Sequence, residues 1–430
     1  MPTAAFTTLG CKVNQYETQK ILDSFEAAGY EVVPFDQPAD VVVINTCSVT
    51  SDAESKSRYT IRRARRTSPN AKIVATGCAA QMSINKEVEM EGADLIVPNP
   101  VKLETFARFS EAFPEIRPLE LLSAPKQPAG RTRATLKVQD GCSVHCSYCS
   151  IPFTRPGMVS RPAIEVLEEA KSMAERGYHE AVLTGVLIGA YGPDSGSGGP
   201  DFEDLVDLLA AESGLNRIRI SSIEVHQVTD RLIEQTRQGK VVPHFHIPLQ
   251  SGSTQVLKDM NRRYDQQMYL DLCQRVYDRI PDCQITTDIM VGFPTETREH
   301  FEQSLEVVRQ VKYLKAHVFR FSPRFGTPAD AWGDPVSPEE KQARAKELAD
   351  AASHTGAEQM KRFLGRTMEV VVERKAGRDG LMEGVTSNWL TIKFTAPVTA
   401  GGTLQWVRIE EFRDGVLYGE LTSRPSLRMA

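Results

Sequence analysis

In the first part of the chain, short apolar runs of strand length alternate with stretches of helical periodicity. The apolar runs are Ala5–Leu9, Val41–Ile44 and Ile73–Ala75, and one helical stretch is Tyr16–Ala28, which is followed by a glycine. Strand–helix alternation favours a parallel sheet with helices on both faces. We therefore predict a Rossmann-like α/β domain over residues 1–113.

A second alternating region follows a proline-bearing segment. Residues 114–133 hold four prolines and show weak periodicity, which indicates a linker. Residues 134–355 contain six strand candidates separated by amphipathic helices, which predicts an open, partial TIM-like (β/α)6 barrel with its chemistry at the strand carboxyl ends. The candidates are Thr135–Gln139, Ala181–Thr184, Arg217–Ser221, His244–Leu249, Ile285–Met290 and Ala316–Phe321.

The last region, residues 359–427, changes to strands separated by glycine-bearing turns, which predicts a small β-barrel. From Lys361 to Arg428 it carries eleven basic and eight acidic residues, whereas the whole chain has a net charge of −5. A basic cap on an acidic body suits contacts with RNA phosphates, although bulk charge alone does not indicate a nucleic-acid binder. The strand candidates are Thr367–Glu373, Trp389–Phe394, Thr403–Ile409 and Val416–Leu421.

The sequence has no apolar run of the roughly 20 residues that span a bilayer, and its first residues lack a signal-peptide pattern. We therefore expect a cytoplasmic protein with no membrane partner. In that reducing compartment, eight cysteines indicate metal binding or catalysis rather than a disulfide framework.

Three cysteines form a CxxxCxxC loop directly after the first barrel strand: Cys142, Cys146 and Cys149. Thiolates are the ligands of iron–sulfur clusters, and three of them on a four-iron cluster leave one iron open for another ligand. The alternative is a structural zinc loop, for which His145 is the one further ligand candidate nearby.

This loop resembles the one that defines the radical S-adenosylmethionine (SAM) superfamily. The resemblance implies that the open iron binds the amino and carboxylate groups of SAM. It also implies that an electron from the reduced cluster splits the sulfonium and yields a 5′-deoxyadenosyl radical. Tyr148 would then lie beside the adenine, and its alternative role is ordinary packing.

A second set of cysteines is spread along the first domain. Cys11, Cys47 and Cys78 each follow a strand candidate, and two of them come directly after glycine. Because the carboxyl ends of parallel strands meet at one edge of a sheet, these thiols are expected to share a ligand. The alternative is three unrelated buried cysteines.

Together these features resemble the methylthiotransferase family over nearly the whole chain. That family combines an N-terminal domain with three cluster cysteines, a radical SAM barrel and a TRAM domain. One departure is Arg155-Pro156-Gly157, where the family commonly shows Arg-Gly. The matching stretches are 9–14, 45–47, 76–78, 141–151, 183–186, 221–224, 246–253, 260–264, 288–294 and 321–327.

The resemblance implies two 4Fe–4S clusters, one at each cysteine trio, and a transfer RNA substrate. One SAM molecule would methylate a sulfur held at the Cys11, Cys47 and Cys78 cluster. A second would be cleaved at the other cluster, and its radical would remove hydrogen from C2 of an adenine that then receives the methylthio group. A reducing electron donor is required, and we expect a monomer.

The resemblance also places SAM contacts at successive strand ends. Glu224 could accept from the ammonium or ribose hydroxyls, and glycines admit close backbone approach. For Ser222 and Ser251 the alternative is turn capping. The expected SAM-binding residues, besides Tyr148, are Thr184, Gly185, Ser222, Glu224, Gln250, Ser251, Gly252 and Ser253.

The Gly-Cys-Lys-Val-Asn stretch at residues 10–14 resembles the branch acting on N6-threonylcarbamoyladenosine beside the anticodon. The rival substrates are isopentenyladenosine in transfer RNA and a ribosomal-protein aspartate. A rival of another class is a non-catalytic iron–sulfur RNA-binding redox sensor. The small barrel would bind the anticodon stem-loop, as would a basic run that is otherwise a solvated helix face: Arg58, Arg62, Arg63, Arg65 and Arg66.

Overall fold

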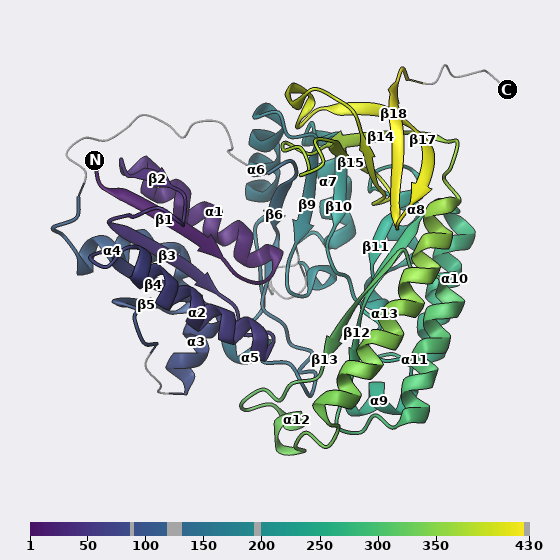
Figure 1. Cartoon of the computed structure of the whole chain (residues 1–430), viewed down its shortest axis with the longest axis horizontal. Coiled ribbons are helices and arrows are strands. Elements are labelled where there is room, and N and C mark those ends of the chain that lie inside the picture. Colours follow the sequence, from purple (N-terminus) through teal and green to yellow (C-terminus); the bar gives the residue numbers. More distant parts are fainter. Residues whose placement is uncertain (87–89, 118–130, 193–198, 425–430) are drawn as a thin grey trace. The chain divides into compact units, whose positions relative to one another are not determined.

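The computed structural model of the chain forms two compact units (Figure 1). The CxxxCxxC loop belongs to the first unit, and most of the predicted radical SAM barrel belongs to the second. The predicted linker falls largely on residues 118–130, which lie outside the described residues. The structure describes residues 1–86, 90–117, 131–192 and 199–424. The first unit is Met1–Gln127, Asp140–Met158 and Ser322–Ala331, and the second is Pro128–Gln139, Val159–Phe321 and Trp332–Ala430.

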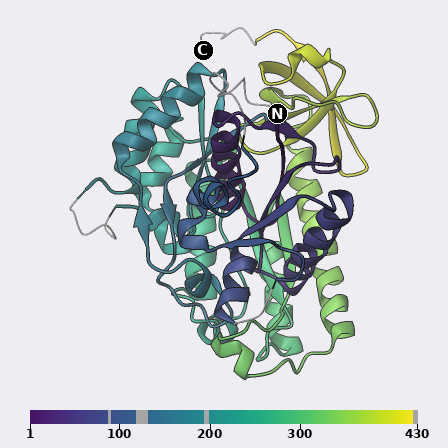
Figure 2. The same ribbon diagram turned by 90° about the vertical axis from the view of Figure 1, so that its left-hand side faces the viewer.

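A five-stranded parallel sheet in the order β2-β1-β3-β4-β5 forms the centre of the first unit, drawn in purple and blue in Figure 2. Its central strand β3 is buried throughout. Val41 and Val43 pack with residues of α1 and α4, while Val42 and Ile44 pack with α2 on the other face. This confirms the predicted parallel sheet with helices on both faces.

The strands of this unit are β1 (Thr3–Thr8), β2 (Glu31–Val33), β3 (Val41–Thr46), β4 (Lys72–Gly77) and β5 (Leu95–Val97). The helices are α1 (Lys12–Ala27), α2 (Ser51–Thr67), α3 (Cys78–Asn85), η1 (Asn99–Glu104), α4 (Thr105–Ala112), α5 (Ile151–Thr154) and α12 (Pro328–Ala331). Two short strands, β7 (Gln139–Asp140) and β8 (Val159–Ser160), flank the segment that carries the CxxxCxxC loop.

The second unit is built on six parallel strands, as predicted. Strands β6, β9 and β10 form one sheet and β11, β12 and β13 another, and an isolated bridge between Ser222 and His246 joins them. No pairing joins β6 to β13 among the described residues, so the barrel is open. The strands are β6 (Ala134–Lys137), β9 (Glu180–Thr184), β10 (Arg217–Ile220), β11 (His244–His246), β12 (Gln284–Val291) and β13 (Lys315–Arg320).

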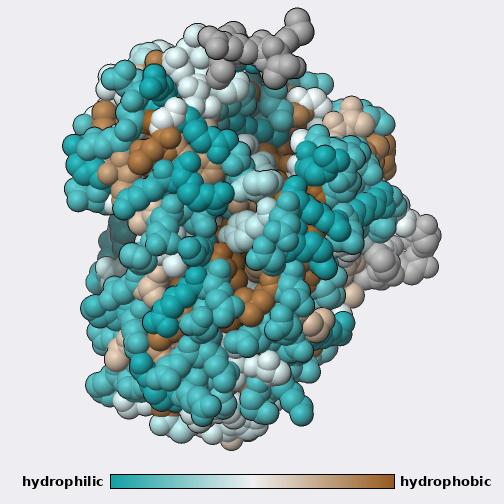
Figure 3. Space-filling model, turned by 90° about the vertical axis from the view of Figure 1, so that its right-hand side faces the viewer, coloured by the Kyte–Doolittle hydropathy of each residue, from teal (hydrophilic) through white to brown (hydrophobic). Residues whose placement is uncertain are grey.

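Amphipathic helices cover the outside of this half-barrel, with apolar faces in one large core and a mostly hydrophilic outer surface (Figure 3). No helix in the described part of the chain is long and apolar enough to cross a bilayer. The α-helices are α6 (Ala163–Glu175), α7 (Phe202–Glu212), α8 (Asp230–Arg237), α9 (Thr254–Asp259), α10 (Gln266–Arg279), α11 (Arg298–Val311) and α13 (Pro338–Lys361). The 3-10 turns are η2 (Ile188–Ala190), η4 (Val225–Gln227) and η5 (Val398–Ala400).

The C-terminal strands close into a five-stranded barrel in the order β14-β15-β16-β18-β17, drawn in yellow and green in Figure 1. The barrel is confirmed, but β15 was not predicted, because its central Gly384 is typical of a turn. A side chain there would collide with Val370, so glycine serves close packing instead. The strands are β14 (Thr367–Val372), β15 (Met382–Thr386), β16 (Thr391–Phe394), β17 (Leu404–Arg413) and β18 (Val416–Thr422).

A stack of side chains joins this small barrel to the start of the half-barrel strands. Arg219 on β10 donates to the Glu180 carboxylate of β9 at 2.6 Å. The ring of Trp389, between β15 and β16, lies 4.5 Å from the Arg219 guanidinium and stacks on His244 of β11 with 5.2 Å between centroids. Trp389 has a φ of 76°, a left-handed conformation that a bulky residue rarely adopts.

Candidate functional site

The cysteines of the first trio follow three neighbouring strands of the parallel sheet. Cys11 caps α1 after β1, Cys47 follows β3, and Cys78 is the first residue of α3 after β4. Strand β3 lies between β1 and β4, so all three thiols lie at one edge of the sheet. Cys47 and Cys78 are buried, and Cys11 is exposed.

The backbone before Cys11 passes directly over Cys47. Gly10 has a φ of +93°, and a Cβ there would lie 2.7 Å from the Cys47 sulfur. Burial raises the pKa of Cys47 to about 11, and the neighbouring thiols Cys78 and Cys11 add to that shift. Cys47 therefore lies close to the other two thiols, and glycine allows the loop of Cys11 to approach that of Cys47.

The donor set suits a polynuclear cluster. All eight cysteines are described, and no disulfide joins any of them. Within the described residues, no three His, Cys, Asp or Glu side chains converge on a point where a single metal ion would sit. Three cysteines at one edge of the sheet provide the type of ligand that an iron–sulfur cluster uses.

The CxxxCxxC loop packs within the same compact unit as the first trio. Gly141 allows the backbone at the start of the loop to lie against the backbone of Gly157, because a Cβ there would lie 1.6 Å from the Gly157 carbonyl oxygen. The backbone N–H of Val144 donates to the Cys142 sulfur at 3.4 Å. His145, the alternative zinc ligand, is exposed and has a φ of 52°.

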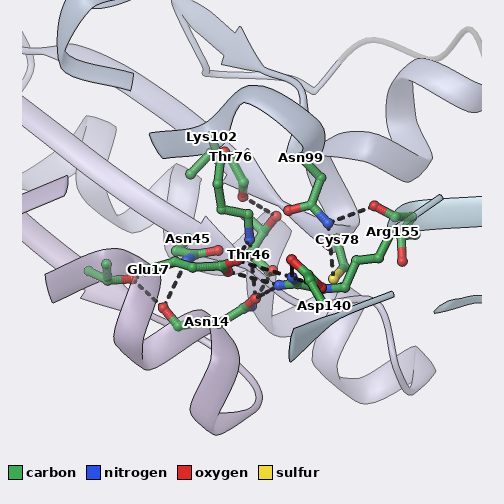
Figure 4. Close-up of polar contacts among 12 residues, drawn as sticks. Asn14, Glu17, Asn45, Thr46, Thr76, Cys78, Asn99, Lys102, Asp140 and Arg155 are labelled. Atoms are coloured by element: carbon green, nitrogen blue, oxygen red, sulfur yellow. Dashed lines mark hydrogen bonds and ion pairs between the residues drawn. The ribbon is translucent and has the colours of Figure 1, made fainter. Parts of the chain in front are cut away.

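A buried network of charges connects the two cysteine-bearing segments (Figure 4). Arg155 donates to the Glu17 carboxylate at 2.8 Å and to Asp140 at 2.7 Å. Lys102 donates to the same Glu17 carboxylate at 2.6 Å, and Asn14 accepts from Arg155 at 2.8 Å. Glu17 and Asn14 lie on α1, so the helix that begins after Cys11 is fixed to the segment that follows Cys149.

Asn99 makes a second link between these segments. Its amide nitrogen donates to the carbonyl oxygen of Thr154 at 2.6 Å and to the Cys78 sulfur at 3.7 Å. Its buried amide oxygen has no hydrogen-bond partner among the described residues. The same amide therefore contacts the sulfur of one trio and the backbone next to the other.

Tyr148 lies in the first unit, while the other expected SAM-binding residues lie at strand ends of the second. Thr184 ends β9, and Gly185 lies against Gln139, where a Cβ would be 3.0 Å from the side-chain oxygen. Ser222 is exposed and bridges to His246. Their roles as SAM contacts stay predictions.

The residues after β11 make a tight turn. Gln250 has a φ of 62°, and the Ser251 hydroxyl accepts from the Ser253 N–H at 3.2 Å, which is the turn role weighed above for Ser251. Gly252 lets helix α11 approach, because a Cβ would lie 2.5 Å from the Ser304 backbone. The turn therefore packs closely against α11.

Glu224 has an ion-pair partner that was not predicted from the sequence. Arg262 forms an ion pair with its carboxylate and lies over the ring of Tyr264. The Arg262 side chain is buried, and Glu224 is more accessible. The match of residues Met260–Tyr264 to the family drew attention to this segment, but it did not indicate that Arg262 pairs with Glu224.

The predicted basic run lies on α2. Four of its arginines are exposed, whereas Arg65 is half-buried and donates to Asp94 at 2.5 Å and to the Ala71 carbonyl at 2.8 Å. Arg58 pairs with Glu54 at 2.9 Å. Arg65 therefore anchors its own domain, and Arg62, Arg63 and Arg66 present the accessible charge.

Comparisons with known proteins identify the class. Residues 3–98 match the family described as "Uncharacterized protein family UPF0004", and residues 136–308 match the Radical SAM superfamily. The solved radical SAM methyltransferase TsrM of Kitasatospora setae has a TM-score of 0.55 at 14% identity, covering 77% of this chain and 75% of that one, which shows the fold alone. This is a radical SAM enzyme, with a [4Fe–4S] cluster and SAM as cofactors.

Curated relatives narrow the class. The threonylcarbamoyladenosine tRNA methylthiotransferase MtaB of Bacillus subtilis is 36% identical, over 98% of this chain and 96% of the relative. MtaB of Thermotoga maritima is 35% identical over 90% and 89%. The tRNA-2-methylthio-N(6)-dimethylallyladenosine synthase of Geobacillus kaustophilus is 34% identical over 97% and 81%. The chain belongs to the methylthiotransferase family of radical SAM enzymes and is a transferase.

Proposed function

We propose that this enzyme transfers a methylthio group to C2 of N6-threonylcarbamoyladenosine in transfer RNA. The observation that carries the proposal is the placement of Cys11, Cys47 and Cys78 at one sheet edge, in the same compact unit as the CxxxCxxC loop. Relatives named for this modification are 35–36% identical over nearly the full chain. Relatives named for dimethylallyladenosine are 32–34% identical.

In this proposal the two trios hold two [4Fe–4S] clusters. Cys142, Cys146 and Cys149 would hold the cluster that binds SAM, and Cys11, Cys47 and Cys78 would hold the cluster that carries sulfur. When bound, these groups supply the electron that cleaves SAM and the sulfur that is methylated and transferred. The chain's own part is placement: Gly10 opens the first site, and Glu17, Arg155 and Asn99 fix its distance from the second.

Recognition of transfer RNA would use the C-terminal barrel, proposed here as a TRAM domain, together with the exposed arginines of α2. Exposed guanidinium groups bind phosphate without reading sequence, which suits a substrate recognised by its anticodon stem-loop. The cytoplasmic location, the electron donor and the monomeric state stay predictions.

Nucleoside mass spectrometry of a deletion strain tests the substrate. The 2-methylthio form of N6-threonylcarbamoyladenosine should disappear and return with the wild-type gene, but not with Cys146→Ala or Cys47→Ala. Loss of the isopentenyladenosine derivative instead would assign the rival transfer RNA substrate. Loss of a methylthio aspartate from a ribosomal protein would assign the other.

A second assay addresses the redox-sensor alternative. Purified enzyme with SAM and dithionite should form 5′-deoxyadenosine, and Cys146→Ala should not. A protein that only senses redox state would form none in either case.

A further inference from the structure

Two buried cations share one buried carboxylate beside Cys78. The Glu17 side chain is 2% exposed, and its cationic partners Lys102 and Arg155 are 2% and 3% exposed. The second acid, Asp140, accepts from Arg155 at 2.7 Å but is 27% exposed, so solvent screens its charge in part. Among the described residues, the fully buried members of the network are two cations and one carboxylate, a surplus of one positive charge that Asp140 offsets in part.

Such a surplus is costly in a protein interior unless another negative charge lies nearby. Burial lowers the pKa of Lys102, while the negative charges of Glu17 and Cys78 oppose that shift. For Arg155 burial also acts downward, but Glu17, Cys78 and Asp140 prevail and hold its pKa well above the usual value. The Asn99 amide lies 3.7 Å from the Cys78 sulfur and 2.6 Å from the carbonyl of the residue before Arg155. Lys102 and Arg155 both donate to Asn14, so the charged network adjoins this sulfur.

A neutral donor acts at the same sulfur. The Asn99 amide nitrogen lies 3.7 Å from Cys78, and its position is fixed by the shorter bond to the Thr154 carbonyl. Nearby charge and hydrogen bonds to sulfur are two of the factors that set the reduction potential of an iron–sulfur cluster. At Cys78 the nearby cations and the Asn99 hydrogen bond both favour the state of a bound cluster that carries more negative charge.

We propose that Lys102 and Arg155 are positioning residues that stabilise the more negative states of the iron–sulfur group bound at Cys11, Cys47 and Cys78. The inference rests on the proposed second cluster. It deepens that function, because the same charges would favour the more negative, sulfur-carrying state of that group.

Charge variants of opposite sign test this. The full chain, with Cys142, Cys146 and Cys149 replaced by alanine, is reconstituted anaerobically and titrated with dithionite while the one-electron reduction is followed by electron paramagnetic resonance. Lys102→Met should lower the ratio of reduced to oxidised cluster about tenfold at a fixed potential, a shift of about 59 mV. Glu17→Gln should raise that ratio by a similar factor.

Controls separate charge from structure. Arg108→Gln removes an exposed cation from α4 and should leave the midpoint unchanged. If the network had a merely structural role, Lys102→Met and Glu17→Gln would shift the midpoint potential in the same direction. That result, or an unchanged midpoint potential in both variants, overturns the proposal. Arg155→Lys keeps the charge and should keep the midpoint near that of the parent.

If Lys102→Met does not fold, the double variant Glu17→Gln/Lys102→Met replaces it, because it removes one buried charge of each sign. Compared with Glu17→Gln alone, it differs only in the Lys102 charge, and its midpoint should be lower. An equal or higher midpoint overturns the proposal. A parent that binds no iron in this background would instead contradict the second cluster, and with it the proposed function.

Discussion

Glu17 and Arg155 lie 138 positions apart in the chain and form a buried ion pair of 2.8 Å within the first compact unit. Glu17 lies on the helix that begins directly after Cys11, and Arg155 follows Cys149 by six positions. One ion pair therefore fixes segments that carry members of both cysteine trios.

Breaking this pair should destabilise the first unit strongly. Arg155→Ala leaves the Glu17 carboxylate buried with Lys102 as its remaining cation, and loss of one partner of a buried pair costs about 3–5 kcal/mol. Urea unfolding followed by circular dichroism measures the change. Arg108→Ala, at the exposed pair with Glu104, should cost about 1 kcal/mol or less, and equal effects would contradict the assigned role.

Adding one methyl group at Gly10 should remove one cluster. The new Cβ of Gly10→Ala would lie 2.7 Å from the Cys47 sulfur, so the loop must move away from the proposed site. We expect iron content after reconstitution to fall by about half, from about eight to about four irons per chain.

Gly177→Ala is the matched control for that variant. It has a similar φ of +83° but meets no atom within 4 Å, so only the left-handed backbone is penalised, by about 1 kcal/mol. Its iron content should equal that of the wild type. Full iron in Gly10→Ala would show that Gly10 does not border the site.

Trp389 should make a large contribution to the attachment of the C-terminal barrel. Trp389→Ala removes the stack on His244 and Arg219, and because Trp389 is half-buried we expect the low end of the usual range, about 3 kcal/mol; alanine also carries a Cβ, so the left-handed backbone strain remains. Thermal unfolding by calorimetry should show a net loss of about 3 kcal/mol. Trp332→Ala, at a tryptophan that is 45% exposed, should cost about 1 kcal/mol or less.

The ionisation of Glu180 should make the free energy of unfolding depend on pH in the acid range. Burial raises the pKa of Glu180, but Arg219 and its neighbours outweigh burial, and the net shift is downward. A carboxylate with a lowered folded-state pKa contributes stability above its unfolded pKa of about 4.3 and loses it as pH falls through the folded value. The gap in unfolding free energy between wild type and Glu180→Gln should therefore narrow as pH falls from about 5 to about 2.

The exposed acid Glu302 provides the comparison for that titration. Glu302→Gln should leave the acid limb of the stability curve nearly unchanged. A constant gap between wild type and Glu180→Gln across the acid range would contradict the direction assigned to Glu180.

The buried strands were predictable because each contains a short, continuous apolar run of strand length. Val41–Ile44 and Ile285–Met290 fall inside β3 and β12 for this reason. The edge strands β2 and β5 are three residues long and are not fully buried, and they were not predicted, although β5 is entirely apolar. Strand length and burial thus set the limit of the fold prediction.

The positions of Cys11, Cys47 and Cys78 after neighbouring strands were predictable, but the charges around them were not. Glu17, Lys102 and Arg155 resemble surface residues in the sequence, and pairing across 138 positions leaves no local pattern. Arg65 shows the opposite error, because a basic run cannot reveal that one member bonds to Asp94 and to carbonyls of its own domain. Ion pairs between residues that lie far apart in the sequence can be identified only in the folded structure.

Iron content after anaerobic reconstitution tests the central claim most directly. The wild-type chain should bind about eight irons, and about four should remain when either Cys11, Cys47 and Cys78 or Cys142, Cys146 and Cys149 are all replaced by alanine. A wild-type value of about four that is unchanged by loss of the first trio would contradict the account, because the enzyme would then hold a single cluster.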